Sequence, residues 1–220
     1  MKPCVETPIN LRGREFGGPK PLFCIPLVAG EPTELVAQAE IARALEPDLV
    51  EWRADFSKDL TPGGMVAAGK LLREVLGDVP MIFTLRKKAE GGAQEIGQAA
   101  RRDTIEAVLR SGSVDVVDLE LDNEPEFLEP LIGIARQQGV RVILAFHDFQ
   151  GTPTNNRMLE MIVSMAATGA DIAKIAVMPK VPGDALRLLQ VTAEARRAHP
   201  KLPLALMSMG ALASISTLPL

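Results

Sequence analysis

Seven short apolar runs recur along this chain at a nearly constant interval, and this rhythm constrains the fold more than any other feature of the sequence. Each run has the length and composition of a buried strand, and successive runs begin about 30 residues apart, which leaves room for one helix in between. The runs cover residues 22–28, 49–56, 80–86, 114–121, 141–149, 171–179 and 203–210. Strands that alternate with helices form successive β-α-β units, so the sequence predicts an α/β protein with a parallel sheet.

The segments between these runs have the periodicity of amphipathic helices, most clearly at 33–46, 63–77 and 183–198. Thr33 and Thr61 stand where the first two of these helices begin. Threonine is a suitable N-cap because its hydroxyl accepts a hydrogen bond from a backbone N–H of the first turn. We therefore expect both threonines to cap their helices.

Two architectures share this order of elements, an open doubly wound sheet and a (β/α)8 barrel. The open sheet usually carries a G-x-G-x-x-G turn after its first strand, but the turn here reads "VAGEPTE". Charged residues instead recur at the ends of many strands, as in a barrel whose site is assembled from all of them. The sequence thus predicts a (β/α)8 barrel of the TIM type, as a single domain over residues 1–220.

The predicted barrel is incomplete at its C-terminal end. After the run at 203–210 only "ALASISTLPL" follows, whereas a further strand with its helices takes roughly 30 to 40 residues. We therefore expect the last strand and helices to be lacking, with unpaired edges on the first and last strands that the tail or another chain would cover. This favours a homodimer or another homo-oligomer. The residues before about position 17 are expected to form a short hairpin under the barrel floor.

Composition excludes several classes of partner. The net charge is −4 and the isoelectric point about 5.4, with no long basic run, which argues against nucleic acid and against an anionic membrane surface. No apolar stretch approaches the roughly 20 residues of a membrane helix. Cys4 and Cys24 have no metal-ligand spacing, and the N-terminus lacks the apolar core of a signal peptide. We expect a soluble, cytoplasmic protein with no nucleic acid or membrane partner.

Charged residues interrupt the apolar strands in pairs. Glu51 and Arg53 are two residues apart and therefore share one face of their strand, with Asp55 near the strand end. This pattern fits either a prepared polar site or a structural ion pair. Asp118 and Glu120 share a face of another strand and are possible counter-charges for a buried cation.

Further polar residues stand at strand ends. Arg86 closes the run at 80–86, and Glu90 lies in the loop just after it. His147 stands near the end of an apolar run, where it is either a proton carrier or a hydrogen-bonded core histidine. His199, the only other histidine, lies in a helix-to-strand connection and is expected to be a solvated loop residue.

Lys174 stands alone in the middle of the run "DIAKIAVMP". Its neighbours on the same face are Ile172 and Ala176, and an apolar setting disfavours the ammonium and lowers its pKa. Such a lysine can attack a ketone and form a Schiff base. It could equally reach solvent at the rim or pair with Glu120. Since Lys174 and His147 belong to adjacent strands, a barrel would bring them to one mouth.

Five motifs in order, "EWRADF", "FTLRKKAEGG", "AFHDF", "AKIAVMP" and "MSMG", resemble the type I 3-dehydroquinate dehydratases of the shikimate pathway of aromatic amino acid biosynthesis. The resemblance runs from about residue 20 to about residue 216. It implies a (β/α)8 barrel, usually dimeric, that needs no metal and no organic cofactor. It also implies a hydro-lyase that converts 3-dehydroquinate to 3-dehydroshikimate through an imine on a lysine.

The resemblance assigns a role to each matching residue. Lys174 matches the Schiff-base lysine, His147 the general acid/base and Glu90 the carboxylate that orients this histidine. The residues that match substrate-binding positions are Glu51, Arg53 and Arg86, with Met207 and Met209 lining the pocket.

The chain departs from the family pattern after "MSMG". The family has a Ser-Arg pair there, whose arginine grips the substrate carboxylate, and then a lid with a serine and a glutamine. Here Ser216 is followed by Thr217, and the lid has no counterpart. We expect imine chemistry to be retained but turnover to be poor. The missing arginine contact with the substrate carboxylate would be worth about 1.5–3 kcal/mol if bidentate, and its loss weakens binding or rate.

Two alternatives to a dehydratase remain at this point. One is another Schiff-base lyase of the aldolase kind on the same barrel, which shares the strand lysine but does not require the other motifs. The second is a barrel without activity that binds a shikimate-like acid or a partner protein.

Overall fold

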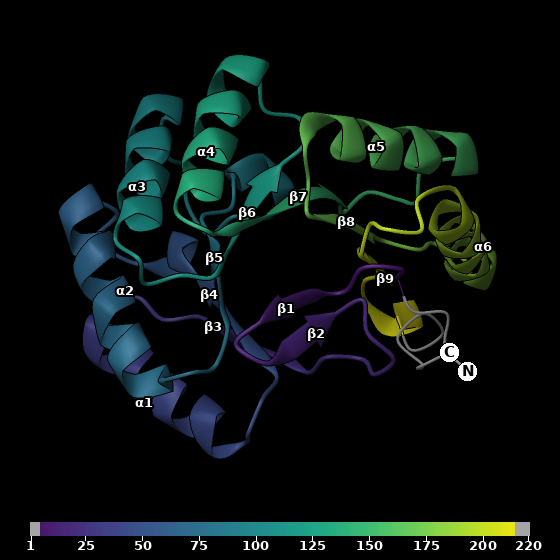
Figure 1. Ribbon diagram of the computed structural model, residues 1–220. Coiled ribbons are helices and arrows are strands. Elements are labelled where there is room, and N and C mark those ends of the chain that lie inside the picture. The colour runs from purple at the N-terminus through teal and green to yellow at the C-terminus, as the bar shows by residue number, and fades with distance from the viewer. Residues whose placement is uncertain (1–4, 214–220) are drawn as a thin grey trace.

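The computed structural model describes residues 5–213, and its centre is one curved sheet of parallel strands (Figure 1). Each strand pairs with the strands that precede and follow it in the chain, in the order β3-β4-β5-β6-β7-β8-β9. The strands are β3 (Cys24–Leu27), β4 (Leu49–Arg53), β5 (Met81–Thr84), β6 (Val116–Glu120), β7 (Arg141–Asp148), β8 (Ile172–Val177) and β9 (Leu204–Ser208). The seven predicted strands and their parallel arrangement are confirmed.

A helix connects each strand to the next, and the helices form an arc outside the curved sheet in Figure 1. They are α1 (Pro32–Ala44), α2 (Pro62–Leu76), α3 (Gln98–Arg110), α4 (Pro125–Gln137), α5 (Asn155–Thr168) and α6 (Pro182–Ala198). Short 3-10 turns follow β4, β5 and β9, namely η1 (Ala54–Phe56), η2 (Lys88–Glu90) and η3 (Ala211–Ala213). The three helices expected from periodicity are present and begin within one residue of the expected positions.

The two predicted caps have different outcomes. Thr61 caps α2, since its hydroxyl accepts a hydrogen bond from the backbone N–H of Gly64 at 3.2 Å. Thr33 does not cap α1, because that helix already begins at Pro32 and its N-cap is Glu31 without a side-chain bond. Proline suits the first position of a helix, where its fixed φ is already helical and its missing N–H has no partner to lose. The prediction for Thr33 was therefore wrong.

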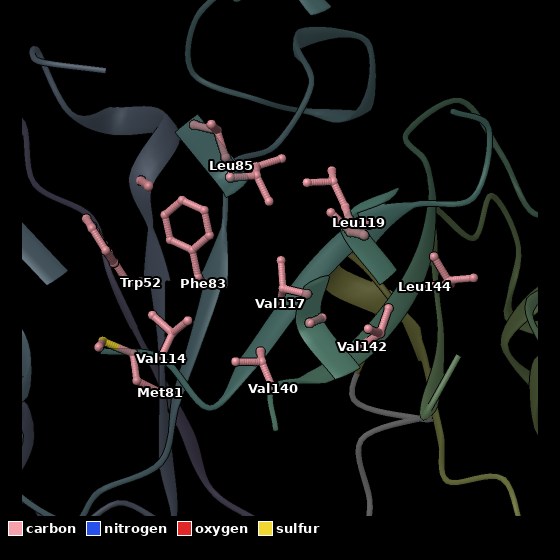
Figure 2. Close-up of a cluster of buried hydrophobic side chains, with 14 of the residues drawn as sticks. Trp52, Met81, Phe83, Leu85, Val114, Val117, Leu119, Val140, Val142 and Leu144 are labelled. Carbon is pink, nitrogen blue, oxygen red and sulfur yellow. The ribbon is translucent and has the colours of Figure 1, made fainter. Parts of the chain in front are cut away.

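The hydrophobic core has two layers because side chains alternate between the faces of each strand. The larger layer fills the space between the sheet and the helices. Figure 2 shows part of it, where the rings of Trp52 and Phe83 meet edge to face with centroids 5.1 Å apart. The smaller layer lies on the inner face of the sheet and joins residues of five strands, namely Leu49, Ile82, Val116, Ile143, Ala145 and Ile172.

The predicted N-terminal hairpin is also confirmed. Strands β1 (Ile9–Leu11) and β2 (Arg14–Phe16) pair antiparallel around Arg12 and Gly13, which both have positive φ angles. Leu11 packs into the smaller apolar layer, beside the residues with which the strands begin. Figure 1 shows the hairpin on the concave side of the sheet. It closes the N-terminal end of the curved sheet and leaves the opposite end to the polar side chains.

The sheet is curled like half of a barrel and does not close within residues 5–213. Strand β3 has no partner other than β4, and β9 has none other than β8, among the described strands. Beside the open edge of β3, Phe23 is 58% exposed. The expectation of an unclosed barrel is thus confirmed, whereas the expected placement of the tail, with Ser216 and Thr217, lies outside the described residues. Among residues 5–213 no helix is both long and apolar enough to cross a bilayer.

Candidate active site

The strand register brings the predicted residues onto the inner face of the sheet. Lys174 lies beside Ala145, and His147 lies beside Ala176, which in turn lies beside Met207 of β9. Residues two apart share a face, so Lys174 and His147 project from neighbouring strands to the same side, one step apart along the strand direction. They occupy the half of the sheet farther from the hairpin, where a barrel assembles its active site.

Lys174 is surrounded by charge, which corrects the apolar setting predicted for it. Its Nζ donates to Asp118 Oδ2 at 2.8 Å and reaches Glu51 Oε1 at 3.5 Å, and its side chain is 14% exposed. Ile172 and Ala176 flank it on the strand, but the long side chain extends past them to the inner faces of β6 and β4. The alternative pairing with Glu120 was wrong as well, because the partner on β6 is Asp118.

The pKa of Lys174 is accordingly raised, not lowered as expected. Burial acts to lower the pKa of the ammonium, but the nearby carboxylates of Asp118 and Glu51 act in the opposite direction and outweigh it. Asp118 is fully buried, and burial alone would raise its pKa, yet Arg86 and Lys174 hold it well below its usual range. In the resting site Lys174 is therefore an ammonium ion held by an ionised aspartate.

His147 and Glu90 form the second group of the site. Oxygen Oε2 of Glu90 lies 3.0 Å from Nδ1 of His147 and accepts the backbone N–H of the same residue at 2.9 Å. Glu90 stands in η2, directly after β5, and the prediction that it orients the histidine agrees with these contacts. Burial raises the pKa of Glu90 to about 8, with further contributions from Glu120 and Asp122.

The pKa of His147 is lowered to about 3, mainly by burial and next by the positive charge of Arg86. The ordinary value for a histidine side chain is 6.5, so His147 departs strongly from it. The main reason is burial of the ring, and the cations Arg86, Lys174 and Arg53 add to it. His147 is therefore neutral in the resting site, which is the form that can accept a proton.

Arg86 joins the two acidic residues of β6. Its Nη2 donates to Asp118 Oδ1 at 2.7 Å and its Nη1 to Glu120 Oε1 at 3.1 Å, and only 3% of its side chain is exposed. The prediction that Asp118 and Glu120 are counter-charges for a buried cation is confirmed. Glu120 also binds Arg101 of α3, a residue that the sequence reasoning missed. Its one signal was its position on the buried face of α3, four residues before Ile105.

Arg53 pairs with Asp55 and not with Glu51. Its Nε and Nη2 each donate to a different carboxylate oxygen of Asp55 at 2.9 Å, and Nη2 reaches the carbonyl of Gly91 at 3.3 Å. Asp55 is fully buried and also accepts the backbone N–H of Ala93 at 2.9 Å. These bonds fix Arg53 at the end of β4 with 23% of its side chain exposed.

Two methionines and the second histidine complete the predicted set. Met207 and Met209 are half-buried at the end of β9, and Met209 donates its backbone N–H to Val177 at 2.8 Å. His199 ends α6 and is half-buried, near the hairpin residue Ile9 and away from the charged cluster.

Other hollows of the surface lack this chemistry. One of about 620 Å³ lies between α4 and α5 and is lined by residues such as Leu128, Phe146 and Met161, without Lys174, His147 or Glu90. Within residues 5–213 no group of three or more histidine, cysteine or acidic residues is arranged to hold a metal ion. The reactive groups of the described chain therefore gather on the inner face of the sheet.

Comparisons with known proteins match the chain to one enzyme family. The family model of type I 3-dehydroquinase matches residues 23–218. The 3-dehydroquinate dehydratase of Geobacillus thermodenitrificans is 39% identical over 212 residues, which are 96% of this chain and 82% of that protein. The crystal structure of the 3-dehydroquinate dehydratase from Geobacillus kaustophilus superposes with a TM-score of 0.93 at 37% identity, covering 96% of this chain and 82% of that one.

A second solved structure, the type I 3-dehydroquinate dehydratase from Clostridium difficile with covalently modified comenic acid, has a TM-score of 0.94 at 28% identity and covers 97% of this chain and 85% of that one. The family model and these relatives span most of the sequence. The chain therefore belongs to the type I 3-dehydroquinase family.

Proposed function

We propose that this chain dehydrates 3-dehydroquinate to 3-dehydroshikimate through an imine on Lys174. The observation that carries the proposal is the placement of Lys174 and the His147–Glu90 pair on one inner face of the sheet. Arg86 lies between Asp118 and Glu120 on the same face. A buried amine and a neutral imidazole on neighbouring strands are the two groups that such a reaction needs. Relatives named for this activity support the same conclusion.

The reaction begins at Lys174. The ammonium first loses its proton to solvent, and the free amine then attacks the C3 carbonyl carbon of the substrate. The carbonyl oxygen leaves as water when the C=N bond forms. The cationic imine withdraws electrons from C2 and makes the proton there acidic. Because Asp118 and Glu51 hold the ammonium form, imine formation is expected to become faster as the pH rises above neutrality.

His147 then moves the proton. Since Nδ1 contacts Glu90, Nε2 is the ring nitrogen that takes the C2 proton, and the resulting imidazolium gives a proton to the C1 hydroxyl, which leaves as water. The C2–H bond breaks, the C1–C2 double bond forms and the C1–O bond breaks, so one proton is taken up and one is returned. Hydrolysis of the imine releases 3-dehydroshikimate and restores the amine of Lys174.

Substrate recognition falls to the remaining predicted residues. Arg53 is the more accessible arginine, with 23% of its side chain exposed against 3% for Arg86. We assign Arg53 to direct contact with the hydroxyl and carboxylate groups of the substrate, together with Glu51. Arg86 acts through its fixed positive charge beside the imine, and Met207 and Met209 line the pocket.

Borohydride trapping tests the covalent step. Incubation with 3-dehydroquinate and borohydride should add the mass of the reduced adduct to Lys174, and Lys174→Met should abolish the addition. The matched control is Lys180→Met, a substitution of an exposed lysine soon after β8, which should trap like the parent chain. Dehydroshikimate formation, followed by its ultraviolet absorbance, separates dehydration from the retro-aldol cleavage of an aldolase-like lyase. Adduct on another lysine would contradict the proposal.

We also propose that the chain acts in the cytoplasm as a homodimer or another homo-oligomer. Within residues 5–213 the edges of β3 and β9 are open, and this supports self-association, because unpaired strand edges and exposed apolar side chains such as Phe23 and Val28 favour a covering partner. Light scattering at micromolar concentration should give at least twice the monomer mass of 23.6 kDa. A monomer under these conditions would rule out the oligomer.

A further inference from the structure

Arg101 is a buried cation on a helix outside the sheet, and no step of the proposed reaction uses it. It lies on α3 with 2% of its surface exposed, although arginine is rarely buried without a partner. Its Nε donates to the carbonyl of Leu85 at 2.9 Å, its Nη1 to Asn123 Oδ1 at 3.1 Å, and its Nη2 to Glu120 Oε2. Each nitrogen of the guanidinium thus has its own acceptor.

A continuous row of alternating charges leads from Arg101 to the reactive amine. Glu120 accepts a hydrogen bond from Arg101 at Oε2 and another from Arg86 at Oε1. The other terminal nitrogen of Arg86 donates to Asp118. Asp118 in turn holds Lys174 at 2.8 Å. The side chains of Glu120 and Asp118 are fully buried, so each carboxylate depends on its two cations for compensation.

We propose that Arg101 is a positioning residue for the imine chemistry: by holding Glu120 in place it keeps Arg86 on Asp118 and thereby sets the charge that faces Lys174. The inference rests on the proposed function. It differs from a purely structural role, in which Arg101 would only tie α3 to the end of β5 and stack over the ring of Phe127.

The direction of the effect follows from the charges around Lys174. The groups that face its amine are Asp118 from β6 and Glu51 from β4, with Arg86 after β5, His147 from β7 and Cys24 from β3. Loss of Arg101 removes one cation from the cluster and leaves Glu120 to attract Arg86 away from Asp118.

Both changes stabilise the ammonium of Lys174. Arg86 then compensates less of the negative charge of Asp118, which is left to attract the ammonium of Lys174. The cluster also has one positive charge fewer to repel that ammonium. We therefore expect the pH at which Lys174 becomes reactive to move upward in a variant that lacks Arg101.

The test compares Arg101→Gln with Arg102→Gln, its exposed neighbour on the same helix. The pH dependence of borohydride trapping with 3-dehydroquinate is measured on Lys174, and so is the pH dependence of its acetylation by acetic anhydride without substrate. Arg101→Gln should slow trapping at pH 7.5 by about tenfold to a hundredfold, because a small displacement of Arg86 and Asp118 misplaces the charges around Lys174. It should also shift both pH profiles to higher pH. Arg102→Gln should leave both profiles unchanged.

Two further variants connect the effect to the row of charges. Arg101→Lys should recover part of the trapping rate, because an ammonium can donate to Glu120 but cannot also donate to the carbonyl of Leu85 and to Asn123. Adding Glu120→Gln to Arg101→Gln should shift the profiles by less than the sum of the single shifts, since residues in one network are not additive.

Each outcome decides the matter. A lower melting temperature for Arg101→Gln with unchanged pH profiles would overturn the positioning role and leave a structural one. If the parent chain gives no trapped adduct but acetylation still shifts, the proposed function fails, while the control of Arg101 over the charge that faces Lys174 stands. Should Arg101→Gln not fold, Asn123→Ala removes bonds of Asn123 to Arg101 and Glu120 and should shift acetylation in the same direction, whereas an unchanged profile would refute the proposal.

Discussion

Glu90 and His147 show how burial acts on two unlike groups in contact. Burial disfavours charge on either side chain, so it raises the pKa of the carboxyl to about 8 and lowers that of the imidazole to about 3. Near neutral pH the carboxyl of Glu90 is therefore protonated and the imidazole of His147 is neutral. A base in this state can accept a proton from the substrate without first losing one of its own.

The raised pKa of Glu90 makes stability depend on pH. The unfolded carboxyl titrates near 4.5 and the folded one near 8, so the native state binds the extra proton between these values. The stability that this proton contributes is complete below pH 4.5 and is lost as the pH rises through about 8. Glu90→Gln removes the group, and the free energy of unfolding of the variant relative to the parent chain should increase between pH 7 and pH 8.5.

Urea unfolding at several pH values measures this difference. The window above pH 7 is chosen because His147, with a folded pKa of about 3 and an ordinary value of 6.5, is then mostly neutral in both states. Glu95→Gln, at an exposed position in the following loop, is the matched control and should show no such trend. A pH-independent difference for Glu90→Gln would mean that the folded carboxyl is already ionised at pH 7.

The charge state of Lys174 could not be predicted from the sequence. The sequence correctly predicted that Lys174 and His147 come together, because strand positions and side-chain alternation depend only on neighbours in the chain. The pKa of Lys174 depends on Asp118, which is 56 positions away in the chain and reaches the amine only after the strands have curled together. Side-chain partners across strands are not encoded in local spacing.

Among the elements, the helix starts separate local from longer-range information. Thr61 accepts the N–H of Gly64, whereas Thr33 lies inside the first turn of α1 and is exposed. Both threonines looked alike in the sequence, and the proline one residue before Thr33 decided the difference. Strand and helix positions were predictable because hydrophobic periodicity sets them, but the exact first residue depends on which backbone N–H groups remain free.

These two threonines provide a matched pair for measurement. Thr61→Ala should lower the free energy of unfolding by about 1 kcal/mol, because α2 loses the acceptor for one N–H of its first turn. Thr33→Ala should change it by less than about 0.5 kcal/mol, as expected for an exposed position without a cap bond. Chemical denaturation of both variants gives the comparison, and equal losses would show that the cap bond of Thr61 contributes nothing.

At the scale of the whole molecule, the two ends of the curled sheet have different tasks. The hairpin and the smaller apolar layer fill the N-terminal end, while the charged cluster occupies the other end. The sequence predicted this division, because the strand order and the polar strand ends both point to a barrel. It also predicted that the sheet would remain open, since seven strand-like runs leave β3 and β9 without a further neighbour in the described chain.

Leu11 tests the separation of the two ends. Leu11→Ala should lower the free energy of unfolding by about 2–3 kcal/mol, because a buried leucine leaves a cavity in the barrel floor. The rate of adduct formation on Lys174 should stay within about twofold of the parent value, since Leu11 lies at the end of the sheet opposite the charged cluster. Leu71→Ala, on the exposed side of α2, is the control and should have little effect on stability. A tenfold loss of trapping in Leu11→Ala would show that the floor and the site are coupled.

The row of buried charges from Arg101 to Lys174 also has a consequence for the response to ionic strength. Dissolved salt screens charges that ions can approach, and the side chains of Arg101, Glu120, Arg86 and Asp118 are at most 3% exposed. Sodium chloride should therefore leave the electrostatics of the imine step nearly constant. Any slowing of the reaction by salt would reflect the arrival of the anionic substrate at the mouth, so that encounter and chemistry can be separated by varying one solute.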